Sequence, residues 1–491
     1  MRLLFVLPEY RREPVGGIRT FYVNLLPALS RVGCQVKVLL ARREFVGREA
    51  FIDESGVEVE YVAADLLAKH DGVYQESQFA GNWLMGQFVP VANAAFEQAN
   101  GGEGFDLVEV TDWPLLFLPW IAQPKPKVPF TISLHSSVGQ MIEYEAKRDS
   151  GRMDFALVRM FEALGFAAAQ SLHANSNLNA RYWEKITNRK VDVLLPLLNQ
   201  KGITTKGTNG HEILTAEDTE STEEDAGLRL AGQAGVAFSN PSTSKLARDS
   251  ENTSLTRSAI GPASLPATPR VRGAVFARLQ NWKGCEILAE ALAECPGIEI
   301  HWYGADMGNT AEGGKWSESL ARNFPKVFEP NFLYKGVLDP ARVSDLMAQA
   351  DFVCVPSLWD VFNLSAVEAM ESGKVVLCSR QAGAEMLIED GVNGFLFEPD
   401  QPGDLAAKLK QIVLMSPEER ERIGRVARES VRDRLQPERL IQHRIAYYRS
   451  VAAQKPEENR NCFLPEILNP KPVAAKSLGQ KIYRWRKKIG I

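Results

Sequence analysis

Residues 2–40 read RLLFVLPEYRREPVGGIRTFYVNLLPALSRVGCQVKVLL. The run from 2 to 7 is almost entirely apolar, which is typical of a strand buried on both faces. A loop with two glycines follows, then a segment at 20–29 with apolar side chains at helical spacing, and then a second apolar run at 35–40. Strand, loop, helix and strand in this order predict a βαβ unit with a right-handed crossover, and therefore a parallel sheet.

The same alternation of strand and helix patterns continues in two blocks. The first block has strand patterns at 56–62, 106–110, 130–134, 171–174 and 191–195. The second block has strand patterns at 273–277, 298–303, 332–335, 352–356 and 375–379, with helix patterns at 284–294, 340–350 and 364–372. Two such blocks predict an α/β fold of two doubly wound, Rossmann-like domains that face each other across a cleft.

Composition divides the chain into five predicted segments. The segment between the two blocks is rich in Ser, Thr, Gly and Ala and poor in large apolar residues, so it cannot easily bury enough surface to offset its ordering entropy. We expect a partly disordered linker or insertion there, with a small independent fold as the alternative. The segments are 1–200 and 270–436 for the two domains, 201–269 for the linker, 437–453 for a last helix that packs back toward the N-terminal domain, and 454–491 for a proline-rich and then basic tail.

Overall composition excludes several classes of protein. The chain has 57 Lys and Arg against 61 Asp and Glu, a net charge of −4, which argues against a nucleic-acid partner. None of its six cysteines forms a C-x-x-C pair, so a zinc site is not expected and a reducing compartment is. The first apolar run ends at Pro8, too soon for a signal peptide, and no apolar stretch is long enough to span a membrane. We therefore expect a cytoplasmic protein.

The basic tail carries a separate hypothesis. Within 476–491, Ile482, Trp485 and Ile489 share one helical face and are surrounded by Lys and Arg, a pattern that suits an anionic membrane surface. This pattern predicts a peripheral location at the inner face of the membrane. The alternative is a solvated, disordered terminus.

The first candidate site consists of Arg278 and Lys283, five residues apart after a predicted strand and before a predicted helix. A guanidinium, an ammonium and the first amides of a helix together suit a diphosphate. Solvated surface cations are the alternative interpretation.

The second candidate site follows the predicted strand at 352–356. Asp360 falls in the loop at the carboxyl end of that strand, where open α/β sheets bind ligands. Asn363 is expected to cap the helix at 364–372, on which Glu368 lies among apolar neighbours. Two acids placed in this way can accept hydrogen bonds from sugar hydroxyls, whereas Glu368 alone is equally consistent with a surface charge near a helix end.

Two further positions lie at predicted strand ends. Gly16 and Gly17 let the backbone approach a ligand closely, although the full G-x-G-x-x-G pattern is absent and a simple tight turn explains them equally well. His135 directly follows the strand at 130–134 and could exchange protons, although a lone histidine is more often structural. The chain contains no D-x-D, no P-loop motif and no G-x-S-x-G, so we expect no metal site and no P-loop or serine-hydrolase chemistry.

Taken in order, these motifs resemble those of family 4 glycosyltransferases, which have the GT-B fold. The resemblance covers about 1–200 and 270–450. The matching stretches are Val15-Gly16-Gly17, His135, Arg278 to Gly284, Asp360 to Met370 with its acid–x7–acid pattern, and Gly383 to Phe395.

The resemblance implies a retaining hexosyltransferase that moves a sugar from a UDP- or GDP-linked donor to a glycan, lipid-linked or small-molecule acceptor, without a metal or cofactor. It assigns the acceptor side to 1–200 and the nucleotide sugar to 270–436. Positions matching Arg278 and Lys283 hold the diphosphate in the family, and the one matching His135 lies near the reacting sugar. The positions assigned to donor binding are Gly16, Gly17, Asp360, Phe362, Asn363, Leu364, Glu368 and Gly383.

The chain departs from the family pattern at three of these places. Asp360 stands where the family usually has Glu, Asn363 replaces a common Gly, and Ala382-Gly383 replaces a glycine pair. Two other functions stay open on the sequence alone. One is a nucleotide-sugar 2-epimerase on the same fold, and the other is a non-catalytic GT-B-like protein that binds a sugar nucleotide or a partner.

Overall fold

A computed structural model describes residues 1–12, 17–77, 80–144, 153–198, 270–308, 314–401 and 403–455. Apart from Arg270, they belong to one compact unit. The linker predicted at 201–269 and the membrane-binding stretch predicted at 476–491 lie outside these residues. No helix within the described ranges is both long enough and apolar enough to cross a membrane.

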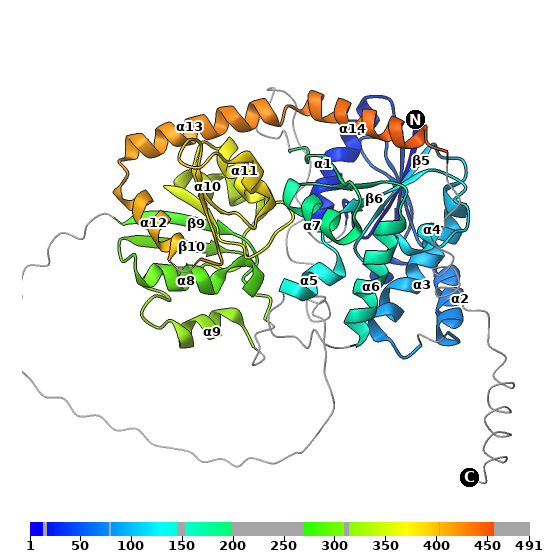
Figure 1. Cartoon of the computed structure of the whole chain (residues 1–491), viewed down its shortest axis with the longest axis horizontal. Helices are drawn as coiled ribbons and strands as arrows, with labels where there is room; N and C mark the ends of the chain where they lie inside the picture. The colour runs from blue at the N-terminus through cyan, green and yellow to red at the C-terminus, as the bar shows by residue number, and fades with distance from the viewer. Residues whose placement is uncertain are drawn as a thin grey trace, which may run out of the picture. The chain divides into compact units, whose positions relative to one another are not determined.

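The N-terminal part of the described chain forms an eight-stranded sheet (Figure 1). All neighbouring strands are parallel except the first two, which are antiparallel. The order across the sheet is β3 (Phe51–Ile52), β4 (Glu58–Tyr61), β2 (Gln35–Leu40), β1 (Arg2–Leu7), β5 (Leu107–Thr111), β6 (Phe130–Leu134), β7 (Leu172–Ala174) and β8 (Asp192–Val193).

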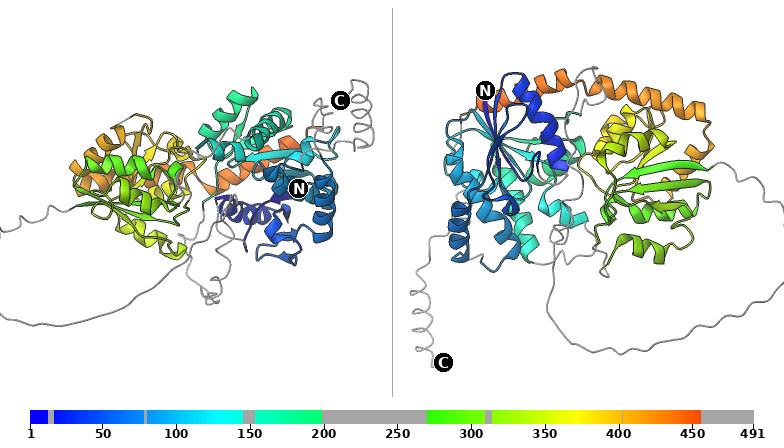
Figure 2. Two further views of the ribbon diagram at one scale, coloured as in Figure 1. Left: turned by 90° about the horizontal axis from the view of Figure 1, so that it is seen from below. Right: turned by 180° about the vertical axis from the view of Figure 1, so that it is seen from behind.

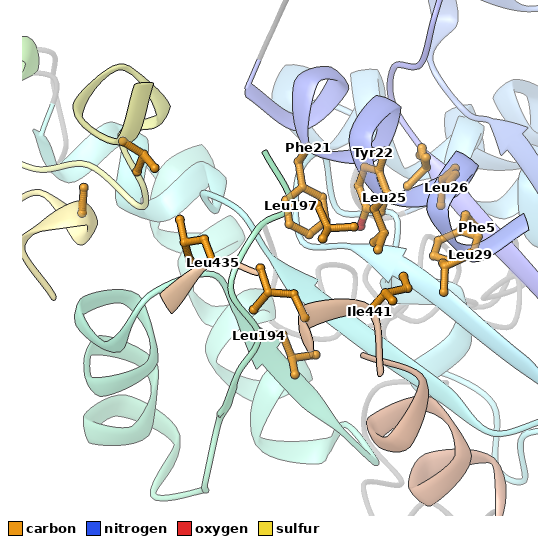
Figure 3. Close-up of a cluster of buried hydrophobic side chains, with 14 of the residues drawn as sticks. Phe5, Phe21, Tyr22, Leu25, Leu26, Leu29, Leu194, Leu197, Leu435 and Ile441 are labelled. Atoms are coloured by element: carbon orange, nitrogen blue, oxygen red, sulfur yellow. The ribbon is translucent and has the colours of Figure 1, made fainter. Parts of the chain in front are cut away.

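Helices cover both faces of this sheet because side chains alternate along its buried strands. In β1, Leu3, Phe5 and Leu7 pack against α1 (Gly17–Arg31) and α14 (Pro437–Ala452). Figure 3 shows part of this cluster. On the opposite face, Leu4 and Val6 belong to a second cluster. Helix α3 (Trp83–Gln98) lies in this cluster and packs against three others, α2 (Ala64–Gln75), α4 (Leu118–Ile121) and α6 (Met153–Ala168). Two more helices, α5 (Val138–Tyr144) and α7 (Asn177–Thr187), follow strands β6 and β7.

The C-terminal part forms a six-stranded sheet that is parallel throughout. Its order is β11 (Phe332–Tyr334), β10 (Ile298–Tyr303), β9 (Val271–Phe276), β12 (Phe352–Val355), β13 (Val375–Ser379) and β14 (Phe395–Phe397). The order of the strands across the sheet reverses between β9 and β12. Open sheets of this kind bind ligands outside the carboxyl ends of the two strands at such a reversal point.

Two layers of helices cover this second sheet as well (Figure 2). One face carries α10 (Val343–Gln349), α11 (Leu364–Glu371) and α13 (Pro417–Arg434). The other carries α8 (Cys285–Ala293), α9 (Trp316–Asn323) and α12 (Asp404–Leu414). Two doubly wound, mainly parallel sheets confirm the predicted α/β fold class.

Polar groups fix the last helix on the first sheet. The Tyr447 hydroxyl of α14 lies 2.7 Å from Thr131 Oγ1 and 2.6 Å from Ser171 Oγ. The neighbouring Tyr448 hydroxyl donates a 2.6 Å hydrogen bond to the buried Glu109 carboxylate in β5. Because unpaired polar groups are costly in such an interior, these bonds specify where α14 lies.

Candidate functional site

The loops after β9 and β12 meet at the reversal point of the second sheet. The first loop ends in a short 3-10 turn, Asn281–Lys283, followed by Gly284 at φ 78°. A Cβ at Gly284 would lie 1.8 Å from the carbonyl oxygen of Pro356, so only glycine fits there. Leu358 N also donates a 2.9 Å hydrogen bond to Trp282 O. The residue type at 284 therefore brings the two loops together.

This contact places Lys283 next to Asp360. Lys283 Nζ forms an ion pair with Asp360 Oδ2, and each side chain is only 14% exposed. The same ammonium lies 4.5 Å from the centre of the Trp282 ring, which stacks on Trp359 at 5.9 Å. The structure thus unites a cation and a carboxylate that are far apart in the sequence, and each neutralises the other.

Asn363 stands at the first position before α11 but does not cap it as predicted. Its side chain makes no hydrogen bond to the helix amides. Instead, Nδ2 donates a charge-assisted hydrogen bond to Asp360 Oδ2 at 2.7 Å, which turns the amide toward Asp360. Leu364 begins α11, and Phe362 packs against the adjoining apolar cluster.

Gly383 supports the same loop from the other side. It begins the short 3-10 helix Gly383–Leu387 after β13, and its N–H donates to Asp360 O at 2.9 Å. A Cβ there would lie 1.9 Å from Val361 O and 2.6 Å from Ser176 Oγ. Ser176 Oγ donates to that Val361 carbonyl at 2.6 Å. The backbone around Asp360 is therefore held by close packing that requires glycine at 383.

Glu368 and Arg278 are both exposed. Glu368 lies on α11 with part of its surface open to solvent. Partial burial of its carboxyl group, followed in size by the negative charge of Glu371, raises its pKa to about 7. Burial raises the pKa of Glu9, and the positive charges of Arg42, Arg19 and Arg278 partly offset this rise. The positive charge of Arg278 therefore lies within electrostatic range of Glu9, in the loop that follows β1.

His135 is buried at the carboxyl end of β6, and both ring nitrogens have partners. Asn175 Nδ2 lies 3.1 Å from Nδ1 and can only donate, so Nδ1 accepts and the ring proton is on Nε2. Nε2 lies 3.0 Å from Ser133 Oγ and 3.2 Å from the Tyr22 hydroxyl. Burial, with the nearby positive charge of Arg444, lowers the pKa of His135 to about 3. The imidazole is therefore neutral at physiological pH.

The glycine loop is only partly visible. Gly16 lies outside the described residues, and Gly17 is exposed at the start of α1, where a Cβ would meet nothing within 4 Å. Among the residues that the structure places, no group of three or more His, Cys, Asp or Glu is close enough to hold a metal ion.

Comparison with known proteins follows the division seen in the two sheets. Residues 16–195 match the family model described as a glycosyl transferase 4-like domain, and residues 273–430 match the model described as glycosyl transferases group 1. The chain belongs to the group 1 glycosyl transferases.

Individual relatives of this group 1 glycosyl transferase are distant. A D-inositol 3-phosphate glycosyltransferase of Corynebacterium kroppenstedtii is 30% identical over 145 residues, which are 28% of this chain and 32% of that protein. An MMP alpha-(1->4)-mannosyltransferase of Mycolicibacterium hassiacum is 40% identical over 89 residues, which are 18% of this chain and 21% of that protein. The matched segments thus span about a third or less of the length of these two relatives.

Solved structures match over a much larger part of the transferase. A sucrose-phosphate synthase from Thermosynechococcus elongatus aligns with a TM-score of 0.61 at 17% identity, over 92% of this chain and 100% of that one. Anabaena HepE, solved in complex with UDP and glucose, aligns with a TM-score of 0.57 at 18% identity over the same shares. The catalytic domain of Arabidopsis thaliana starch synthase IV, bound to ADP and acarbose, aligns at 0.58 and 13%, over 92% of this chain and 99% of that one. The fold is GT-B.

Among the acids that the sequence analysis did not select are two that are buried in the first sheet's half of the chain, at His135 and at the segment that follows it. Asp112, directly after β5, accepts the N–H of His135 at 3.0 Å through Oδ1, and burial raises its pKa to about 7. Glu162 in α6 accepts the N–H of Gly139, and burial raises its pKa to about 8. A signal was available for Asp112, because it stands at a strand end like the residues that were selected.

Proposed function

We propose that this group 1 glycosyl transferase moves a sugar, with retention of configuration, from a nucleoside diphosphate sugar to an acceptor, without a metal ion. The observation that carries the proposal is the ion pair of Lys283 and Asp360 at the reversal point of the second sheet. A cation for the diphosphate and a carboxylate for sugar hydroxyls are thereby adjacent, as donor binding requires.

Charge accounts for the expected chemistry. Breaking the bond between sugar and diphosphate builds negative charge on the leaving phosphates, and fixed positive groups lower that barrier. Lys283 and Arg278 would supply this charge once the diphosphate competes with Asp360 for the ammonium. Asp360 would then accept hydrogen bonds from the sugar, and Glu368 would bind the ribose.

Known proteins support a nucleotide sugar as the donor. HepE has been solved with UDP and with UDP-glucose, and starch synthase IV with ADP. The relatives named above are transferases by their descriptions, which favours transfer over epimerisation and over binding alone. We propose a UDP- or GDP-linked donor and a glycan, lipid-linked or small-molecule acceptor. No separate general base is assigned, because a retained configuration places the leaving and arriving groups on one face of the sugar.

A donor screen tests this proposal. Binding of UDP, GDP and their glucose and mannose derivatives is measured by thermal shift and calorimetry, and turnover by release of the nucleoside diphosphate, with and without EDTA. Stabilisation by the true donor follows mass action. We expect Lys283→Gln and Arg278→Ala to reduce turnover by about 100-fold each, as losing one preorganised charge-stabilising group typically does.

The matched control is Lys410→Ala, since Lys410 is a surface lysine of the same lobe that pairs with Glu294 at 2.7 Å. Its turnover should equal that of the wild type. Absence of binding and turnover with all of these donors would overturn the proposal. Binding without transfer or hydrolysis would favour the non-catalytic alternative, and inversion of the product's anomeric configuration would refute retention.

A further inference from the structure

Asn363 has a side chain that does not serve its own helix. The residue is 7% exposed and precedes the first residue of α11, where an asparagine normally accepts a hydrogen bond from a helix amide. No such bond forms. Its Nδ2 donates instead to Asp360 Oδ2 at 2.7 Å and approaches Ser357 Oγ at 3.4 Å.

Chemistry fixes the orientation of this amide. An ionised carboxylate has only acceptor sites, so the atom 2.7 Å from Asp360 Oδ2 must be the amino group of Asn363. Its carbonyl Oδ1 is then buried, with no hydrogen-bond partner among the residues described. A buried acceptor without a partner destabilises the folded state. The chain thus keeps the bond to Asp360 and forgoes the helix cap that would satisfy Oδ1.

The bond matters because Asp360 Oδ2 has two donors of different kinds. One is the Lys283 ammonium, on a flexible stem and strongly attracted to phosphate; the other is the Asn363 amide, on a short stem anchored at the start of α11. A bound diphosphate competes more strongly for the ammonium than for the amide, because a hydrogen bond between two charged groups is stronger than one from an uncharged donor.

We propose that Asn363 is a positioning residue that holds the Asp360 carboxylate in place when Lys283 turns to the donor diphosphate. This inference rests on the proposed function and adds to it a residue that recognises the sugar indirectly. It predicts that Asn363 affects the part of the affinity that comes from the sugar and leaves the part that comes from the nucleotide.

The test compares Asn363→Ser with the wild type. Serine is an effective residue at this position of a helix but is too short to reach Asp360, so stability should be unchanged or higher. Calorimetry with UDP and GDP, each alone and as UDP-glucose and GDP-mannose, gives the factor by which the sugar increases affinity. We expect the variant to bind the bare nucleotide like the wild type. The factor by which the sugar increases affinity, here called the sugar factor, should fall about tenfold, as expected for the loss of a hydrogen bond to a charged group.

A second variant controls for general effects of losing a helix cap. Ser416 caps α13 through a reciprocal pair of bonds with Glu419, at 3.2 and 2.9 Å. Ser416→Ala should lower the melting temperature without changing the sugar factor. A structural role for Asn363 would make its variant behave in the same way.

The outcomes separate the inference from the proposed function. If the wild type gains affinity from the sugar and Asn363→Ser keeps that gain, with Asp360 in one conformer in the variant's crystal structure, only the inference fails. If the wild type binds none of the four compounds, the proposed function fails and the inference with it. Loss of the sugar factor at unchanged stability supports the inference.

Discussion

Replacing Gly383 by alanine should lower the stability of the protein and disturb the proposed donor site. The new Cβ would lie 1.9 Å from Val361 O, 2.6 Å from Ser176 Oγ and 2.7 Å from Ser176 Cβ, whereas real Cβ contacts stay beyond 3.0 Å. Val361 O is a backbone atom, so the loop that carries Asp360 must move. Crowding costs about 1–3 kcal/mol, and loss of the bond between Ser176 and Val361 costs about 1 kcal/mol more.

The expected total of about 2–4 kcal/mol corresponds to a decrease of about 5–15 °C in melting temperature for a lobe of this size. Differential scanning fluorimetry measures this decrease, and calorimetry with UDP- and GDP-sugars measures the loss of donor binding. Gly297→Ala is the matched control, because its new Cβ would meet nothing closer than 3.6 Å, from Val413 Cγ1. A Gly383→Ala protein that melts and binds like the wild type would refute the packing argument.

Two further substitutions test the buried charges of the first lobe. Burial raises the pKa of Glu162 to about 8 from 4.5, so the stability that this group contributes is full below pH 4.5 and is lost as the pH rises through 8. Relative to the wild type, the free energy of unfolding of Glu162→Gln should therefore rise by on the order of 3 kcal/mol between pH 5 and pH 9. Melting temperatures of the two proteins that change in parallel over this range would contradict this expectation. Arg444→Met removes the positive charge that opposes the raised pKa of the buried Glu109 and should cost about 3–5 kcal/mol in urea denaturation, whereas the exposed Arg449→Met should cost little.

Most of the fold follows from local sequence patterns. The strands β6, β10 and β13 begin and end at the residues that the apolar runs predict. Neither β3 nor β14, with two and three residues, was predicted, although β8 is as short as β3 and was predicted from the longer pattern at 191–195. These short strands form because a neighbouring strand presents free backbone groups, and that neighbour is set by the tertiary structure.

The candidate site was predictable in its residue types but not in its pairings. Strand ends and spacing selected Lys283, Asp360 and Asn363 one by one, but no spacing rule predicts that the first two form an ion pair. The expected cap by Asn363 is wrong because its amide is oriented by a hydrogen bond from Nδ2 to the Asp360 carboxylate, and Oδ1 accepts no bond from the helix. Glu109 was missed although a carboxylate inside the apolar run LVEVT indicates that a buried partner must exist elsewhere in the chain.

A buried partner of Glu109 is Tyr448 on the last helix, and the hydrogen bonds around Glu109 extend to His135. His135 Nε2 donates toward Tyr22, the Tyr22 hydroxyl donates to Glu109 at 2.7 Å, and Glu109 also accepts from Tyr448 of α14. The Asn175 amide at Nδ1 places the ring proton on Nε2, which faces both Ser133 Oγ and this chain of bonds to Tyr448, more than 300 residues away in the sequence. Because the pKa of His135 is lowered to about 3, protonation of the ring at neutral pH is unfavourable. We therefore expect that His135, if it takes part in the proposed sugar transfer, acts as a neutral, oriented group, and α14 belongs to the structure around it.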